Sequence, residues 1–446
     1  MSLSENNFLG RRTTVAVGFI MDQGSISVGP VFIDKNFLGQ HLDLRARVEK
    51  IITRRSLDVV TDAPPPEQNH FPTNDPGGIQ DDGVIRSEGT GAVITLTKTL
   101  WSLASKWGGG GLFSYNNAVA RGFYGTGLLG YDDPLTTDAE RIPYEYRVRT
   151  WVMRGSATRQ WGQRYKHGVE LGYGVSSVTP SLLSTQAFDP TLVDPLVLQH
   201  FQDDVFPRDE VVSAPSLEYS VYRAKYGTVR NVDTYELAED IRFGPNAGVG
   251  VTQSFKTLGS TYRFTRPSIG VGWTIPWGRD GFARLSGSAQ IRIQEGRTLD
   301  NTAGAQLRAA TPTIAFFRFI AQVGVDTRWH DESNNYYAIG SDNGLRAYRI
   351  QQFRGDRRFA AQLEARSVPV PVWVVRLGGV LFYDGGGAAN YFGGMQYAHD
   401  VGFGARMLIP QSSRELFRFD LAFPLTSAPG TLAGHPRFIA GFDSYF

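Results

Sequence analysis

Apolar and polar residues alternate along many short segments of the chain, and the segment 417–423 shows the pattern clearly. Four large apolar residues occupy alternate positions and share one face of an extended strand, because strand side chains alternate with a period of two. Arg418 and Asp420 fall on the opposite face. Such a strand fits poorly in a soluble sandwich, whose inner face is dry. It suits a closed barrel in lipid, which has an apolar exterior and a wet or plugged lumen.

Eighteen segments with strand character are separated by turn-forming residues. In chain order they are 13–22, 26–34, 41–52, 92–100, 109–117, 144–153, 167–176, 217–226, 247–255, 267–276, 282–293, 302–309, 316–329, 359–367, 372–384, 401–409, 417–423 and 437–446. The pattern predicts an all-β protein, an antiparallel transmembrane β-barrel of 16 strands, or 18 if no segment has been split. Short and long connections alternate along the first half, which places the amino terminus on the periplasmic side.

Composition is consistent with a single barrel. The 446 residues divide into a periplasmic lead-in at 1–12 and a barrel domain at 13–446. The absence of cysteine excludes disulfides, thiolate metal sites and a cysteine nucleophile. A net charge of +2 gives no indication of a nucleic-acid partner. The first twelve residues lack the apolar core of a signal peptide, so we expect the native precursor to carry one upstream.

Candidate chemistry outside the strands is weak. The glycine run 108–111 is followed by no Lys and Ser/Thr pair and precedes a strand, which argues against a phosphate-binding loop. The seven histidines show no metal-ligand spacing, and His399 with Asp400 is a lone pair, so we expect no metal and no cofactor. Acidic pairs such as Asp203 and Asp204 are interpreted as solvated loop surface, with weak Ca²⁺ binding as the alternative. No hydrolase signature occurs, and we expect no enzymatic activity.

Several motifs together resemble a known family. They are IDKNFLG (33–39), GSDNGLRAY (340–348), GDRRFAAQLEAR (355–366), FYDGGGAAN (382–390) and RFDLAFPL (418–425), together with the aromatic carboxy terminus. With these motifs the chain resembles the barrel domain of the BamA/TamA superfamily of outer-membrane assembly and translocation proteins, of the bacterial surface antigen type. The resemblance implies a long sixth extracellular loop that folds into the lumen.

The resemblance also implies a lock between this loop and the barrel wall. The loop tip comprises Gly344, Leu345, Ala347 and Tyr348 around Arg346. Arg346 is expected to pair with Glu364 and Asp384, whose strands direct both acids toward the lumen, because a guanidinium binds a carboxylate through two parallel hydrogen bonds. The alternative is that Arg346 is a solvated loop residue and Asp384 begins a turn. Ala347 stands where the family usually has Gly, which is unfavourable if the position needs a positive φ.

The function implied by the resemblance is insertion or translocation of proteins or lipids through a weak seam between the first and last strands. The seam would join 13–21 to 438–446 and contain Gly18, Gly441 and the terminal Phe446, and glycine weakens strands. The implied partners are outer-membrane lipids and lipopolysaccharide, unfolded outer-membrane protein clients, and periplasmic POTRA domains or accessory proteins. The expected location is the outer membrane of a Gram-negative-type envelope. The alternative is a channel, receptor or surface antigen with the same barrel, and an outer-membrane enzyme ranks third.

Overall fold

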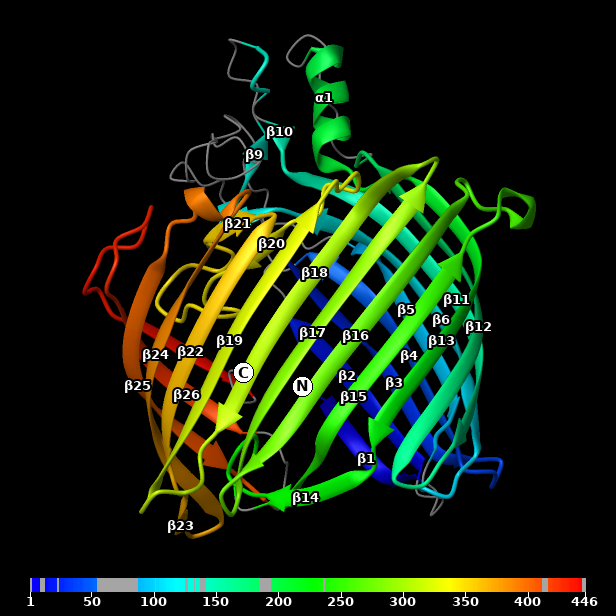
Figure 1. Ribbon diagram of the computed structural model, residues 1–446. Helices are drawn as coiled ribbons and strands as arrows, with labels where there is room; N and C mark the ends of the chain where they lie inside the picture. The colour runs from blue at the N-terminus through cyan, green and yellow to red at the C-terminus, as the bar shows by residue number, and fades with distance from the viewer. Residues whose placement is uncertain are drawn as a thin grey trace.

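A single large antiparallel sheet curls around a central lumen in the computed structural model (Figure 1). The structure describes residues 2–8, 13–21, 24–53, 87–100, 102–124, 127–131, 133–136, 142–183, 194–235, 237–410 and 416–442. The sheet contains 21 strands, and every pairing within it is between antiparallel neighbours. The sheet therefore has the all-β architecture that the alternation predicts.

The strands of the main sheet follow one another in chain order. They are β1 (Ser2–Phe8), β2 (Thr13–Met21), β3 (Ser25–Phe37), β4 (Leu42–Thr53), β5 (Ser87–Lys98), β6 (Trp107–Arg121), β11 (Glu145–Trp161), β12 (Tyr165–Ser181), β13 (Glu210–Arg223), β14 (Lys225–Val229), β15 (Glu239–Gln253), β16 (Phe264–Trp277), β17 (Gly281–Gln294), β18 (Arg297–Ala310), β19 (Phe317–Trp329), β22 (Arg357–Ser367), β23 (Val370–Val372), β24 (Val375–Ala389), β25 (Ala398–Leu408), β26 (Phe417–Pro424) and β27 (Arg437–Phe442).

Each of the eighteen predicted segments overlaps a strand of this sheet, and β1, β14 and β23 are additional, which gives the 21 strands. The glycine run 108–111 lies inside β6 and forms no loop. Six short strands of two or three residues lie in the connections between β6 and β11 and between β19 and β22. They are β7 (Phe123–Tyr124), β8 (Gly127–Leu128), β9 (Gly130–Tyr131), β10 (Ile142–Pro143), β20 (Tyr337–Ile339) and β21 (Phe353–Gly355).

The outward face of the sheet is apolar and exposed. On β15 to β18, four outward side chains are between 46% and 58% exposed: Val249, Ile269, Leu285 and Leu307. Positions next to them along the same strands are glycine, serine, glutamine or arginine and face the lumen. An exposed apolar belt around a polar interior is the arrangement of a barrel that lies in lipid. No helix in the described part of the chain is long and apolar enough to cross a membrane.

The loops at one end of the barrel pack into a small core of their own around helix α1 (Pro195–Val205) (Figure 1). Asp194 caps the helix by accepting a hydrogen bond from the Leu196 N–H. One face of the helix, ending at Val205, packs on Tyr131 and Tyr144 of the preceding loop. None of the segments predicted from the sequence covers residues 195–205, so this helix is an addition to the prediction.

The two ends of the sheet differ from the predicted seam. Residues 2–8, predicted as a lead-in, form β1 and pair with β2, so that Ser2 lies opposite Gly18. The other edge of β2 pairs with β3. Because both edges of β2 are occupied, the predicted pairing of 13–21 with the last strand does not occur among the described residues, and β1 and β27 are the ends of the sheet.

Candidate functional site

The connection between β19 and β22, residues 330–356, folds back into the barrel, and we call it the inserted loop. It begins and ends in the paired strands β20 and β21. Between them, Gly340 accepts a hydrogen bond from the Leu345 N–H and donates its own N–H to Asn343 Oδ1, which closes a tight turn. The tip residues 345–348 are buried. Counted along the eighteen strands, this loop is the seventh connection at the α1 end, because thirteen strands precede it.

Arg346 at the loop tip contacts three carboxylates of the barrel wall. Its Nη2 lies 2.5 Å from Oε1 of Glu364 on β22, and its Nε lies 3.0 Å from Oδ2 of Asp384 on β24. Its Nη1 lies 3.6 Å from Oδ2 of Asp420 on β26. All four side chains are 0% exposed. Arg346 is therefore no solvated loop residue, and Asp384 lies within β24 rather than at a turn.

Two further arginines complete an alternating array of charges. Arg406 Nη1 lies 2.5 Å from Asp420 Oδ1, and Arg366 Nε lies 2.5 Å from Glu364 Oε2. Both arginines are at most 3% exposed. Burying a charge without a partner is costly, so the close alternation of guanidinium and carboxylate groups is what makes this arrangement tolerable.

The loop tip also hydrogen-bonds to the last strands through its backbone and Tyr348. The Ala347 N–H donates to Asp400 Oδ2 at 3.1 Å, and the Tyr348 hydroxyl donates to the His399 carbonyl at 2.9 Å. Arg437 of β27 donates to the Tyr348 carbonyl at 2.8 Å. Ala347 is not among the described residues with a positive φ, so alanine is accommodated there without backbone strain.

Sequence reasoning identified only part of this cluster. The structure brings Arg346, Glu364 and Asp384 together, but Arg366, Arg406 and Asp420 belong to the same array and were not singled out as site residues. Their signal was present, since each occupies a charged position on the lumen-facing side of an alternating strand. Which of many lumen charges meet the loop depends on the register of five strands, and one sequence does not give that register.

The array links the loop tip to the barrel wall through ion pairs. In the described part of the chain, no group of three or more His, Asp or Glu residues is arranged to hold a metal ion. The carboxylates of Glu364, Asp384 and Asp420 are engaged with guanidinium groups. The His399 side chain is engaged with the Tyr383 hydroxyl at 2.7 Å.

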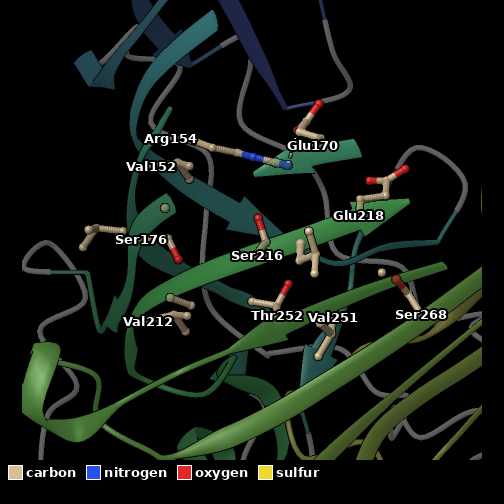
Figure 2. A pocket seen from close by; sticks show the side chains of 15 residues that line it. Val152, Arg154, Glu170, Ser176, Val212, Ser216, Glu218, Val251, Thr252 and Ser268 are labelled. Atoms are coloured by element: carbon tan, nitrogen blue, oxygen red, sulfur yellow. Dashed lines mark hydrogen bonds and ion pairs between the residues drawn. The ribbon is translucent and has the colours of Figure 1, made fainter. Parts of the chain in front are cut away.

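The opposite side of the barrel has a cavity lined by polar side chains and by aliphatic ones such as Val152 and Val251 (Figure 2). A cavity of about 260 Å³ lies over β11, β12, β13, β15 and β16. Its floor carries Ser216 and Ser268, and Arg154 Nη2 lies 3.0 Å from Glu170 Oε1. Glu218 lies directly opposite Glu170 in the register of β12 and β13. This cavity thus lies over strands other than β22, β24 and β26, on which the tip of the inserted loop packs.

The predicted seam residues lie apart from this cluster. Gly18 is on β2 between Ser2 and Gly29, and Gly441 is on β27 opposite Arg418. Phe446 lies outside the described residues. The two glycines are therefore near the two ends of the sheet but are not paired with each other.

Comparisons with known proteins give likenesses of fold only. No protein-family model and no curated protein matches the sequence. Among solved structures, BamA from Haemophilus ducreyi lacking POTRA domains 1-3 is similar, with 11% identity and a TM-score of 0.45 over 96% of this chain and 70% of that chain. CdiB from Escherichia coli is similar with 9% identity and a TM-score of 0.46, over 97% of this chain and 62% of that chain. The FrpB iron transporter from Neisseria meningitidis gives 10% identity and a TM-score of 0.40, over 96% of this chain and 71% of that chain.

The chain spans less than two thirds of the length of CdiB. Its own residues define the architecture: an apolar outer belt, a charged lumen and an inserted loop make it an outer-membrane-type β-barrel, similar in fold to the BamA and CdiB barrels.

Proposed function

We propose that the protein assists the insertion or translocation of client proteins, or lipids, at the outer membrane, as a barrel of the BamA/TamA type. The observation that carries this proposal is the pairing at the two ends of the sheet. In the described residues β27 pairs with β26, β1 pairs with β2, and no pairing joins β1 to β27. A strand edge with unpaired backbone groups can accept another strand by β-augmentation.

The inserted loop supports this edge from inside the barrel. Through Arg346, Ala347 and Tyr348 it bonds to β22, β24, β25 and β26, and Arg437 ties β27 to it. The last strands are thereby held as one unit while the outer side of β27 stays available for pairing. This role is structural, so we propose a non-enzymatic protein.

The proposed surroundings follow from the outer surface. The apolar belt contacts outer-membrane lipids and lipopolysaccharide in a Gram-negative-type envelope, and the loops around α1 face the exterior. Unfolded outer-membrane proteins are the proposed clients. Periplasmic POTRA domains or accessory proteins would deliver these clients to the β14 end.

Photocrosslinking from the edge strand tests the proposal. A photoreactive amino acid at Ala440, an exposed position on β27, should capture client proteins in cells that are assembling their outer membrane. The matched control is Leu285, which is exposed on the outer face of β17 within the continuous sheet. Equal capture of clients from both positions, or capture from neither, would contradict a role for the edge.

A channel is the second candidate, and the cavity over β11 to β16 favours it. Beside aliphatic side chains, this cavity presents hydroxyl groups and the Arg154–Glu170 pair, polar groups of the kind that line ion pathways. A channel predicts steady conductance in planar bilayers and no client captured at Ala440. The same crosslinking experiment therefore separates the two functions.

A further inference from the structure

Residues 230–235 follow β14, which lies at the end of the barrel opposite α1 (Figure 1). We call residues 230–235 the crossing turn. Its shape is fixed by Glu239, which accepts hydrogen bonds from the backbone N–H groups of Asp233 at 3.0 Å and Thr234 at 2.8 Å. Asn231 adopts a φ of 59° within it, a conformation that asparagine tolerates better than most residues. The turn is therefore a folded element.

The crossing turn lies against the inner surface of strands far from β15 in the sheet. Val232 packs on inward side chains of β17, β18 and β19, among them Phe282 and Ile320. Tyr235 reaches further and packs on Leu408 of β25 and on Leu416. Val232 and Tyr235 are each 1% exposed. The turn thus extends across the β14 end of the lumen.

A side chain cannot be added to the wall under Tyr235 without displacing it. A Cβ at Gly378 of β24 would overlap the Tyr235 hydroxyl and ring. The Tyr235 hydroxyl has no hydrogen-bond partner among the described residues, although it is buried. Close packing against glycine, rather than a polar contact of the hydroxyl, therefore holds this residue.

One arginine connects the crossing turn to the ionic cluster of the inserted loop. Arg366 of β22 donates from Nη1 to the Val232 carbonyl and from Nε to Glu364 Oε2. The other oxygen of Glu364 accepts from Arg346. A continuous chain of charge-assisted hydrogen bonds therefore runs from the loop that enters at the α1 end to the turn that lies at the β14 end.

We propose that the crossing turn is an inner gate of the lumen, that Arg366 holds it closed, and that Glu364 couples its opening to release of the inserted loop. The contacts of the turn with the wall include the bond from Arg366 to the Val232 carbonyl, the apolar packing of Val232 and Tyr235, and an ion pair of Asp233 with Arg308. Removing Arg346 takes away the shortest contact of Glu364 Oε1 and leaves Arg406 Nη2 at 3.5 Å from it. The carboxylate can then shift, and Arg366 can shift with it and lose its bond to the Val232 carbonyl.

Thiol labelling of the full-length protein in detergent micelles tests the gate. The chain has no cysteine, so Val232→Cys introduces a single thiol at a buried position and reports opening through its rate of reaction with a water-soluble maleimide. Adding Arg366→Ala should raise this rate about tenfold or more, the effect of losing a hydrogen bond to a charged group. Adding Arg346→Ala should raise the rate severalfold, although Arg346 is not among the residues that contact the turn.

The matched control is Arg358→Ala in the same Val232→Cys background. Arg358 also lies on β22 and faces the lumen, where it pairs with Asp326 at 2.6 Å and lies 5.6 Å from the centre of the Tyr337 ring. Neither contact belongs to the chain of bonds that reaches the turn. The labelling rate should stay at the parent value. An equal increase with Arg358→Ala would show general loosening of the barrel and overturn the proposal.

Other outcomes are equally decisive. An unchanged rate with Arg366→Ala overturns the gate, and an unchanged rate with Arg346→Ala beside a raised rate with Arg366→Ala overturns the coupling. If Arg366→Ala does not show the heat-modifiable migration of a folded barrel, Arg366→Lys takes its place. An ammonium group lacks the fork that binds both partners, so the rate should be intermediate, and a parental rate would overturn the gate.

This inference deepens the proposed function but is tested separately from it. Labelling at Val232→Cys involves no client, whereas the photocrosslinking experiment at Ala440 involves no motion of the turn. If the labelling test contradicts the gate, the result for client capture still stands. If no client is captured, the labelling result still stands.

Discussion

The guanidinium carbon of Arg346 lies 3.8 Å from the centre of the Phe382 ring, so the cation stacks on an aromatic face while its nitrogens reach carboxylates at the ring's edge. Phe382 lies opposite Glu364 in the pairing of β24 with β22. The ring and the carboxylate are therefore presented side by side by neighbouring strands. A planar, delocalised cation satisfies both contacts, and an ammonium group does not.

Arg346→Ala should release the inserted loop. It leaves Asp384 without its buried guanidinium partner, and removing one member of a buried pair costs about 3–5 kcal/mol. We expect faster cleavage of residues 330–356 in limited proteolysis and a lower unfolding temperature. Arg346→Lys should restore only part of the protection, because lysine loses the stacking and the second hydrogen bond. Wild-type proteolysis of Arg346→Lys would contradict this account.

The control for this experiment is Arg358→Ala. Its ion pair with Asp326 lies on the lumen wall and is about 30% exposed on both sides. Its guanidinium also lies 5.6 Å from the centre of the Tyr337 ring at the base of the inserted loop, far from the buried tip. Pairs that retain contact with water contribute about 0–1 kcal/mol. Proteolysis of the inserted loop should therefore change little, and a loss as large as that of Arg346→Ala would show that burial of the cluster is not the cause.

Asp384→Asn should partly rescue Arg346→Ala. Asp384 and Asp400 lie directly opposite each other on β24 and β25, and both are buried. Without Arg346 the two like charges face each other, whereas asparagine removes one of them at nearly constant volume. We expect a coupling free energy of about 0.5–3 kcal/mol in a double-mutant cycle measured by urea unfolding in micelles. Strict additivity of the two single changes would contradict a direct interaction.

The barrel could be predicted from the sequence because the alternation that a membrane strand requires is visible within each strand by itself. Each membrane strand must alternate between lipid and lumen, so every one of the eighteen strands carries its own signal. The same alternation placed Glu364 and Asp384 on the inner wall. Which inward charges meet Arg346 depends on strand register over long separations. The family resemblance, rather than the spacing of the residues, brought Arg346, Glu364 and Asp384 together as candidates.

The elements that were missed have weaker or non-local signals. Helix α1 could have been found, since Asp194 and Pro195 form a capping pair and apolar residues recur every four positions at 197, 201 and 205. Strand β1 lacks a clear apolar alternation, and its partner is fixed only by the edge that β2 leaves open. In the sequence, the crossing turn resembles an ordinary polar connection. The strands on which Val232 and Tyr235 pack are more than forty residues away, so no local pattern reveals these contacts.

The loop core around α1 should be sensitive to alkaline pH. His200 hydrogen-bonds to Asp133 at 2.5 Å, and this bond raises the pKa of His200 above its ordinary value. A raised pKa in the folded state stabilises the docked helix at low pH, below about 6.5, and the contribution is lost as the pH rises through the raised pKa. Hydrogen-exchange protection factors of α1 should therefore fall between pH 6 and pH 9.

His200→Asn is the control for this pH dependence. Asparagine does not titrate, so the protection factors of α1 should be nearly constant over the same range. A fall in protection equal to that of the wild type would assign the effect to another group, and Asp133→Asn would then identify whether the carboxylate is involved at all.

Alanine substitutions at two glycines on the lumen face can separate the effect of close packing from that of strand propensity. A Cβ at Gly402 of β25 would overlap the Leu421 carbonyl and the Phe382 ring, whereas a Cβ at Gly270 of β16 would have no atom within 4 Å. Gly402→Ala should therefore destabilise the barrel by about 1–3 kcal/mol, the range for overpacking. Gly270→Ala should change stability by no more than about 0.5 kcal/mol, because the open lumen accepts the methyl group.

The Gly402 clash also displaces the Phe382 ring on which Arg346 stacks. Gly402→Ala, and not Gly270→Ala, should therefore expose the inserted loop to protease. Equal urea midpoints for the two variants would show that the wall beneath the loop can relax, and would remove close packing as the reason for glycine at this position.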